Sequence, residues 1–203
     1  MSNKKITYIV IALIVIFGIV AGIYLTKEDK LPNGGLNNEI IEENNFTNNG
    51  TDQNTEENLL VKDDFSINVP EGWQETAAPQ GISAMVVNIN EEVTDPNAKR
   101  INFKSYFSVS YDSSQGRSRE EYLEYTKDIL KQSIPEIVFT HQEAQAIEAE
   151  ITQQGVDFKV LIVMVNGIGE EDIWVISFNT TKDKWNEYKD LFYETAGSFL
   201  TKF

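Results

Sequence analysis

The residue types that usually perform chemistry in proteins are scarce in this chain. It has one histidine, His141, and no cysteine. A histidine can act as a general base, but it needs a nucleophile beside it, and no serine motif of that kind accompanies His141. The lack of cysteine excludes disulfides, cysteine-ligated zinc, thiol catalysis and a lipid-modified cysteine. We therefore expect His141 to be a surface or strand-edge residue and the protein not to be an enzyme.

Clusters of acidic residues are the second group of side chains that could do chemistry. Glu170, Glu171 and Asp172 follow a glycine-rich stretch and form a short acidic turn. Neighbouring carboxylates can bind Ca²⁺, but this turn lacks the regular ligand spacing of a calcium loop. A solvated turn is the favoured interpretation, and the pair Asp63-Asp64 is open to the same two interpretations. The sequence predicts no metal site and no cofactor.

Two arginines flank the start of a predicted helix. Arg117 and Arg119 are placed to hold an anion against the amide groups of a helix N-terminus. Glu120 and Glu121 follow directly and would compete for the same amides and charges. An anion site is therefore not expected there.

The remaining pattern is that of a layered α+β domain. A capping box, Ser118 to Glu121, opens a one-sided helix that Pro135 ends. A second helix is predicted over 182–196. Apolar runs and period-two alternation predict strands at 65–70, 82–89, 101–111, 137–140, 144–151, 156–166 and 173–179.

The links between these segments constrain the topology. Residues 70–72 and 153–155 are predicted turns, and 90–100 is a predicted polar loop. Links between successive strands are too short for parallel crossovers. We expect a mainly antiparallel sheet of about six strands covered by helices, an αβα sandwich, with residues 156–166 as a central strand.

The N-terminal region has the pattern of a membrane anchor. Residues 6–25 carry no charge and no proline, and at 1.5 Å per residue they would cross a bilayer core of roughly 30 Å. A cleaved signal peptide is the alternative, with Lys4 and Lys5 before the apolar run and a small-residue site at 20–22. Basic residues on the two sides differ little in number, and the layout favours an external C-terminal domain. The expected organisation is a cytoplasmic tail (1–5), a transmembrane helix (6–25), a disordered tether (26–59) and a folded domain (60–203).

The charge of the chain limits its partners. The formal net charge is −15, of which residues 60–203 carry −11. Such a surface repels phosphate backbones, so nucleic-acid binding is not expected. It also repels anionic lipid headgroups, so the domain should stand away from the bilayer. The tether is rich in Asn and Glu and has too little apolar surface to fold.

One stretch resembles a known family. Residues 65–73, Phe-Ser-Ile-Asn-Val-Pro-Glu-Gly-Trp, resemble the opening of PsbP-like domains, the photosystem II extrinsic-subunit family and its bacterial relatives. Later segments agree in order: Tyr122-Leu123 within a helix, 174–178 as a late strand and 196–199 closing the last helix. The resemblance covers about residues 60–203.

This resemblance implies an antiparallel sheet between helical layers, export or membrane attachment, and a non-enzymatic role. It also implies a binding surface in a cleft beside Trp73, to which we add the acidic turn of Glu170, Glu171 and Asp172 as a candidate part of that surface. The chain departs from the family in having no lipidated cysteine and only one histidine. Photosynthetic function is therefore not carried over.

These observations predict a membrane-tethered, extracytoplasmic interaction or assembly module with an envelope or membrane protein as partner. The alternative is an extracytoplasmic domain that binds a small ligand or a metal. A hydrolase that depends on His141 is the least favoured hypothesis.

Overall fold

The computed structural model describes residues 58–202. The predicted cytoplasmic tail (1–5), transmembrane helix (6–25) and all but the last two residues of the tether (26–59) lie outside the described residues. Within the described part, no helix is both long and apolar enough to cross a membrane. The secondary structure comprises β1 (Asn58–Val61), β2 (Phe65–Val69), β3 (Trp73–Thr76), β4 (Ala84–Asn88), α2 (Pro96–Arg100), β5 (Tyr106–Ser113), α3 (Arg119–Ser133), β6 (Val138–Gln142), β7 (Ala146–Gln153), β8 (Val156–Asn166), β9 (Asp172–Thr181), a 3₁₀ turn η1 (Lys182–Lys184), α4 (Trp185–Gly197) and β10 (Leu200–Thr201).

Two antiparallel sheets form the framework. Seven strands are ordered β3-β4-β5-β9-β8-β7-β6, and a smaller sheet is ordered β1-β2-β10. All pairings are antiparallel, which confirms the α+β class and the antiparallel sheet predicted from the short links. Strand β8 has neighbours on both sides and is buried along most of its length, as its continuous apolar run predicts.

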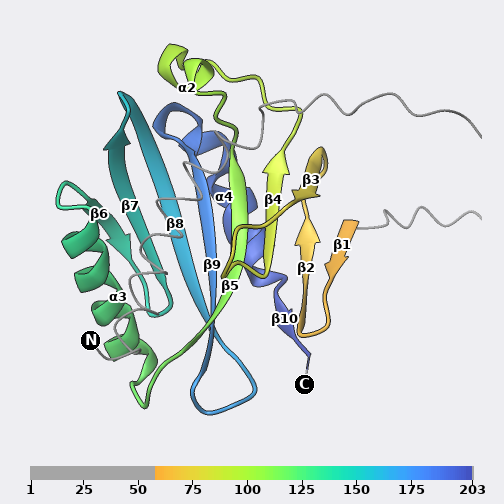
Figure 1. Ribbon diagram of the computed structural model, residues 1–203, viewed down its shortest axis with the longest axis vertical. Helices are drawn as coiled ribbons and strands as arrows, with labels where there is room; N and C mark the ends of the chain where they lie inside the picture. Colours follow the sequence, from red (N-terminus) through yellow and green to blue (C-terminus); the bar gives the residue numbers. More distant parts are fainter. Residues whose placement is uncertain (1–57, 203) are drawn as a thin grey trace, which may run out of the picture.

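Helices cover the large sheet on its two faces (Figure 1). Helix α4 contributes Trp185, Tyr188 and Phe192 to a core cluster that also holds Phe65 and Ile67 of β2. On the opposite face, α3 packs over a separate cluster formed with strands β7, β8 and β9. The alternation of apolar side chains in the strands supplies both clusters, because successive residues of a strand point to opposite faces.

Helix α3 begins where its capping box predicts. The Ser118 side chain accepts a hydrogen bond from the Glu121 amide, and the Glu121 carboxylate accepts one from the Ser118 amide at 2.8 Å. These reciprocal bonds satisfy two backbone donors that have no partner within the helix. The helix ends at Ser133, just before Pro135.

The predicted polar loop at 90–100 is partly wrong. Residues Pro96–Arg100 form α2, whose first turn is capped by the Asp95 side chain through a 2.7 Å hydrogen bond from the Ala98 amide. The strand predicted from Ile101 begins only at Tyr106. Ile101 and Phe103 are nevertheless buried, in a third cluster with Phe158. A five-residue helix is too short to show a helical period, which explains the error.

Three short strands were not predicted. Strands β1, β3 and β10 have four, four and two residues, and all lie at sheet edges. Their sequences lack the alternation that marks a half-buried strand. They form because neighbouring strands offer hydrogen-bonding partners, which is tertiary information.

Candidate functional site

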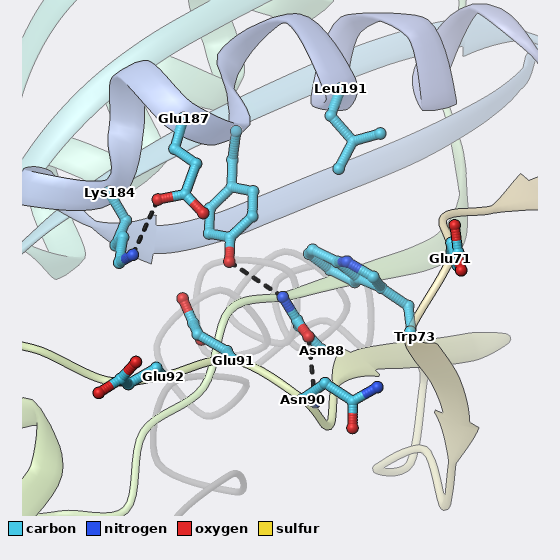
Figure 2. Close-up of a pocket in the computed structure, with 11 residues that line it drawn as sticks. Glu71, Trp73, Asn88, Asn90, Glu91, Glu92, Lys184, Glu187 and Leu191 are labelled. Atoms are coloured by element: carbon cyan, nitrogen blue, oxygen red, sulfur yellow. Dashed lines mark hydrogen bonds and ion pairs between the residues drawn. The ribbon is translucent and has the colours of Figure 1, made fainter.

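A cleft lies beside Trp73, at the end of the large sheet where β4 stops and α4 starts. Its volume is about 640 Å³, a size within the range of about 300–1,000 Å³ typical of ligand sites. It is lined by Glu71, Gly72, Trp73, Asn88, Asn90, Glu91, Glu92, Lys184, Glu187, Tyr188 and Leu191. Figure 2 shows these side chains, which come from the β2–β3 turn, β3, the end of β4 with its following loop, η1 and α4.

Trp73 forms a fixed wall of this cleft. Only 7% of its surface is exposed. Its ring meets those of Tyr188 and Phe192 edge-on, with centroids 6.0 Å apart in both pairs. The preceding Gly72 has a φ of +78°, a conformation that glycine adopts without strain. The turn thereby places Trp73 at the start of β3 with its ring in the core.

Asn88 and Tyr188 form the middle of the cleft. The Asn88 side-chain amide donates to the Tyr188 hydroxyl at 3.0 Å, and its carbonyl oxygen accepts from the Asn90 amide at 3.2 Å. Burial raises the pKa of Tyr188 to about 12, and the negative charges of Glu91 and Glu187 act in the same direction. Tyr188 is therefore neutral at physiological pH and can donate a hydrogen bond, but it is not a proton acceptor for catalysis.

Two of the four cleft carboxylates are held by neighbouring groups. Glu91 accepts from the backbone amide of Ser105 at 2.5 Å and from its hydroxyl at 2.7 Å. Glu187 accepts from the Lys184 ammonium at 2.8 Å. These contacts fix the orientation of both carboxylates, so their negative charges occupy defined positions in the cleft.

The predicted acidic turn lies elsewhere. Glu170 and Glu171 are in the β8–β9 loop and Asp172 begins β9. Asp172 pairs with Ser113, whereas Trp73 lies near the Tyr106–Asn179 end of the same strands. With about 3.3 Å per strand residue, the two places are roughly 23 Å apart along β9. The structure does not bring Trp73 together with the three acidic residues.

Asp172 has a local role within that turn. Its carboxylate accepts from the Tyr111 hydroxyl at 2.6 Å and from the Gly169 amide at 2.9 Å. The hydrogen bond from Tyr111, and then that from Gly169, lower the pKa of Asp172. Glu171 accepts from the Ser113 hydroxyl at 3.3 Å. Groups that could ligate a cation are thus used to hold the hairpin.

The other residues singled out from the sequence lie apart from the cleft. His141 is exposed on edge strand β6, where its ring nitrogen is 3.1 Å from a Glu143 oxygen. Asp63 and Asp64 are exposed in the β1–β2 turn. Across residues 58–202 there is no group of three His, Asp or Glu side chains placed to hold a metal ion.

Arg117 and Arg119 are engaged with protein groups. The Arg117 guanidinium lies 4.3 Å from the centroid of the Tyr125 ring. Arg119 donates to the side-chain oxygens of Asn166 at 3.2 Å and Gln145 at 3.3 Å. These contacts tie the start of α3 to the neighbouring strands and use donors that an anion would need.

Sequence reasoning found Trp73 but missed most of the cleft. Glu71, Glu91 and Glu187 were not singled out, because they come from three separate segments and form no motif. Glu71 lies in the predicted turn 70–72 and within the stretch of residues 65–73 that resembles PsbP-like domains. A turn placed just before a buried tryptophan was the one signal in the sequence that could have directed attention to this side chain.

Comparisons with known proteins find remote likeness between this chain and several solved structures. No family model matches the chain, and no curated protein matches it. It is similar to the solution structure of a cyanobacterial PsbP from Synechocystis sp. PCC 6803, with 12% identity, a TM-score of 0.44, and coverage of 68% of this chain and 86% of that one. A PsbP structure among the matches confirms the resemblance predicted from residues 65–73.

Two further solved structures are similar to the same extent. LpqN of Mycobacterium tuberculosis, described as involved in cell envelope biogenesis, has 10% identity and a TM-score of 0.45 over 68% of this chain and 83% of its own. The Ran-binding protein Mog1p of Saccharomyces cerevisiae has 13% identity and a TM-score of 0.45 over 67% and 89%. At these values the likeness is remote.

Proposed function

We propose that this chain is a membrane-tethered, extracytoplasmic interaction module that binds an envelope or membrane protein and catalyses no reaction. The cleft beside Trp73 carries this proposal. The residues that line the cleft are Glu, Asn, Gly, Trp, Tyr, Lys and Leu, so it holds no serine or cysteine nucleophile paired with a histidine base. A partly apolar, partly charged concavity of this kind suits recognition.

The membrane part of the proposal rests on the sequence. Residues 6–25 carry no charge and no proline and follow Lys4 and Lys5, and the acidic, Asn-rich segment 26–59 separates them from the domain. Protease treatment of intact cells tests the location. We expect the domain to be removed from the cells, with a cytoplasmic marker protein left intact as control. A domain that survives until the cells are lysed would contradict the external location.

The partner is tested by cross-linking in intact cells with an affinity tag after Phe203, followed by mass spectrometry. We expect a reproducible membrane or envelope protein in near-stoichiometric amount. The control is a chain with a protease site in the tether, cleaved before cross-linking, so that the domain is no longer held at the membrane. Equal enrichment from the two samples, or no enriched protein, would count against the interaction module.

A second candidate is a small-ligand binding domain, favoured by the volume of the cleft. Pockets that bind drug-sized ligands have volumes of about 300–1,000 Å³, and that of the cleft is about 640 Å³. Thermal denaturation of the protein with pooled metabolites, Ca²⁺ or Mn²⁺ tests this candidate. A ligand that binds only the folded state raises the midpoint of unfolding. No change at saturating concentrations would dismiss it.

A further inference from the structure

The four carboxylates of the cleft divide into two kinds. Glu91 and Glu187 are held by Ser105 and Lys184, as described above. Glu71 and Glu92 are exposed and form no hydrogen bond or ion pair with any other side chain or backbone group of residues 58–202. No ion pair within residues 58–202 therefore neutralises their negative charge. A partner can offset it without displacing an existing contact.

The positions of these two side chains suit an extended occupant. Figure 2 shows Glu71 and Glu92 on opposite sides of Asn88, whose side-chain amide donates a hydrogen bond to Tyr188. Leu191 and Trp73 also line the cleft and supply its apolar surface. An occupant that fills the cleft meets a carboxylate at each end and apolar surface in the middle.

The charge of the cleft selects the class of occupant. Four glutamates and one lysine line it, which gives a formal charge of −3. Phosphate groups and anionic headgroups are repelled by this field, and cations are attracted. The described residues hold no group of three ligands for a metal. A lysine or arginine side chain has the required combination of apolar stem and charged end.

We propose that the cleft binds an extended segment of a partner protein that carries two basic side chains. One pairs with Glu71 and the other with Glu92, while their alkyl stems cover Leu191 and Trp73. This proposal rests on the proposed interaction module and names the chemistry of its partner.

A peptide binding experiment with the full chain in uncharged detergent micelles tests this assignment. The probe is a fluorescein-labelled decapeptide of alternating Lys and Ala, followed by fluorescence anisotropy, with the Glu and Ala counterpart as a probe of opposite charge. The test variant is Glu71→Gln with Glu92→Gln. The control variant is Glu170→Gln with Glu171→Gln, which changes the net charge equally at the far end of the sheet.

We expect the Lys peptide to bind and the Glu peptide not to bind. The cleft variant should raise the Kd roughly fivefold, the size expected for losing two partly exposed ion pairs. The control variant should raise the Kd by less than about 1.5-fold. Raising the salt concentration should reduce this difference between the variants. Equal weakening by the two variants would overturn the proposal, because the peptide would then respond to total charge alone, including that of the tether.

Cross-linking of the same variants in cells distinguishes a failure of this ligand assignment from a failure of the proposed interaction module. If cells carrying Glu71→Gln with Glu92→Gln yield the cross-linked partner in unchanged amount, this ligand assignment is overturned while the interaction module stands. If the variant loses the partner and the control variant keeps it, the two proposals are supported together. Failure of the Lys peptide to bind the unmodified chain would overturn the assignment directly.

Discussion

The two ends of the large sheet are both rich in carboxylates, but they use them differently. At the β8–β9 loop, Asp172 and Glu171 accept hydrogen bonds from Tyr111 and Ser113 of the adjacent strand β5, and Asp172 accepts another from Gly169 of the loop. At the Trp73 cleft, Glu71 and Glu92 have no such partner among the described residues and face a concavity. Figure 1 shows the loop at the bottom of the sheet and the end of β4 at the top. Acidic composition alone therefore does not locate a binding site; the partners of each carboxylate do.

The largest expected effect concerns the wall of the cleft. Trp73→Ala removes a ring that is 7% exposed and packs against Tyr188 and Phe192. We expect a loss of about 3–5 kcal/mol in the free energy of unfolding, measured by urea denaturation. Ile168→Ala in the β8–β9 loop, where the side chain is 62% exposed, should change it by less than about 0.5 kcal/mol. A loss below about 1 kcal/mol for Trp73→Ala would show that the cleft wall is not part of the core.

The next effect tests the close packing of the acidic turn. A Cβ at Gly167 would lie 2.4 Å from the Asp172 Cβ, so Gly167→Ala forces the hairpin apart. We expect a loss of about 1–3 kcal/mol in the free energy of unfolding. Gly197→Ala is the matched control, because a Cβ there meets nothing within 4 Å. If the two variants are equally stable in urea, the turn is looser than this geometry indicates.

A smaller effect concerns the pH dependence of the turn. The pKa of Asp172 is lowered in the folded protein, so its hydrogen bonds stabilise the fold above the ordinary aspartate pKa of about 3.9 and are lost as the pH falls through the lower folded value. Tyr111→Phe removes the principal donor and should raise the titration midpoint of Asp172. Carboxyl carbon chemical shifts measured by NMR report this midpoint. Ser113→Ala, which removes a donor to Glu171, should leave it unchanged.

The smallest effect on stability is expected from the free carboxylates of the cleft. Glu71→Gln with Glu92→Gln removes no hydrogen bond to residues 58–202, so the free energy of unfolding should change by less than about 0.5 kcal/mol. Glu91→Gln is the contrasting variant, because Glu91 accepts two hydrogen bonds from Ser105. We expect it to be the less stable of the two in urea. The reverse order would remove the distinction between held and free carboxylates.

Much of the fold was predictable because its longer elements have strong local patterns. The apolar run of β8 predicts Val156–Asn166 with the bounds that the structure has, and the Ser118 capping box marks the start of α3. The short elements were missed for the converse reason. Helix α2 and strands β1, β3 and β10 have two to five residues each, fewer than a periodic pattern needs.

The sequence by itself determined where most strands of the large sheet lie and that short links make them pair antiparallel. It also determined the acidic charge and drew attention to Trp73, which forms the wall of the cleft. Only the tertiary structure decided which carboxylates meet. Glu71, Glu92 and Glu187 belong to a turn, a loop and a helix that are distant in the chain, and the folding of α4 against β2 and β9 brings them to one end of the sheet. The same packing separates Trp73 from Asp172. Trp73 lies near the end of β5 and β9 where Tyr106 pairs with Asn179, whereas Asp172 pairs with Ser113 at the opposite end. Local preferences act over a few residues, whereas register and packing act over the whole domain.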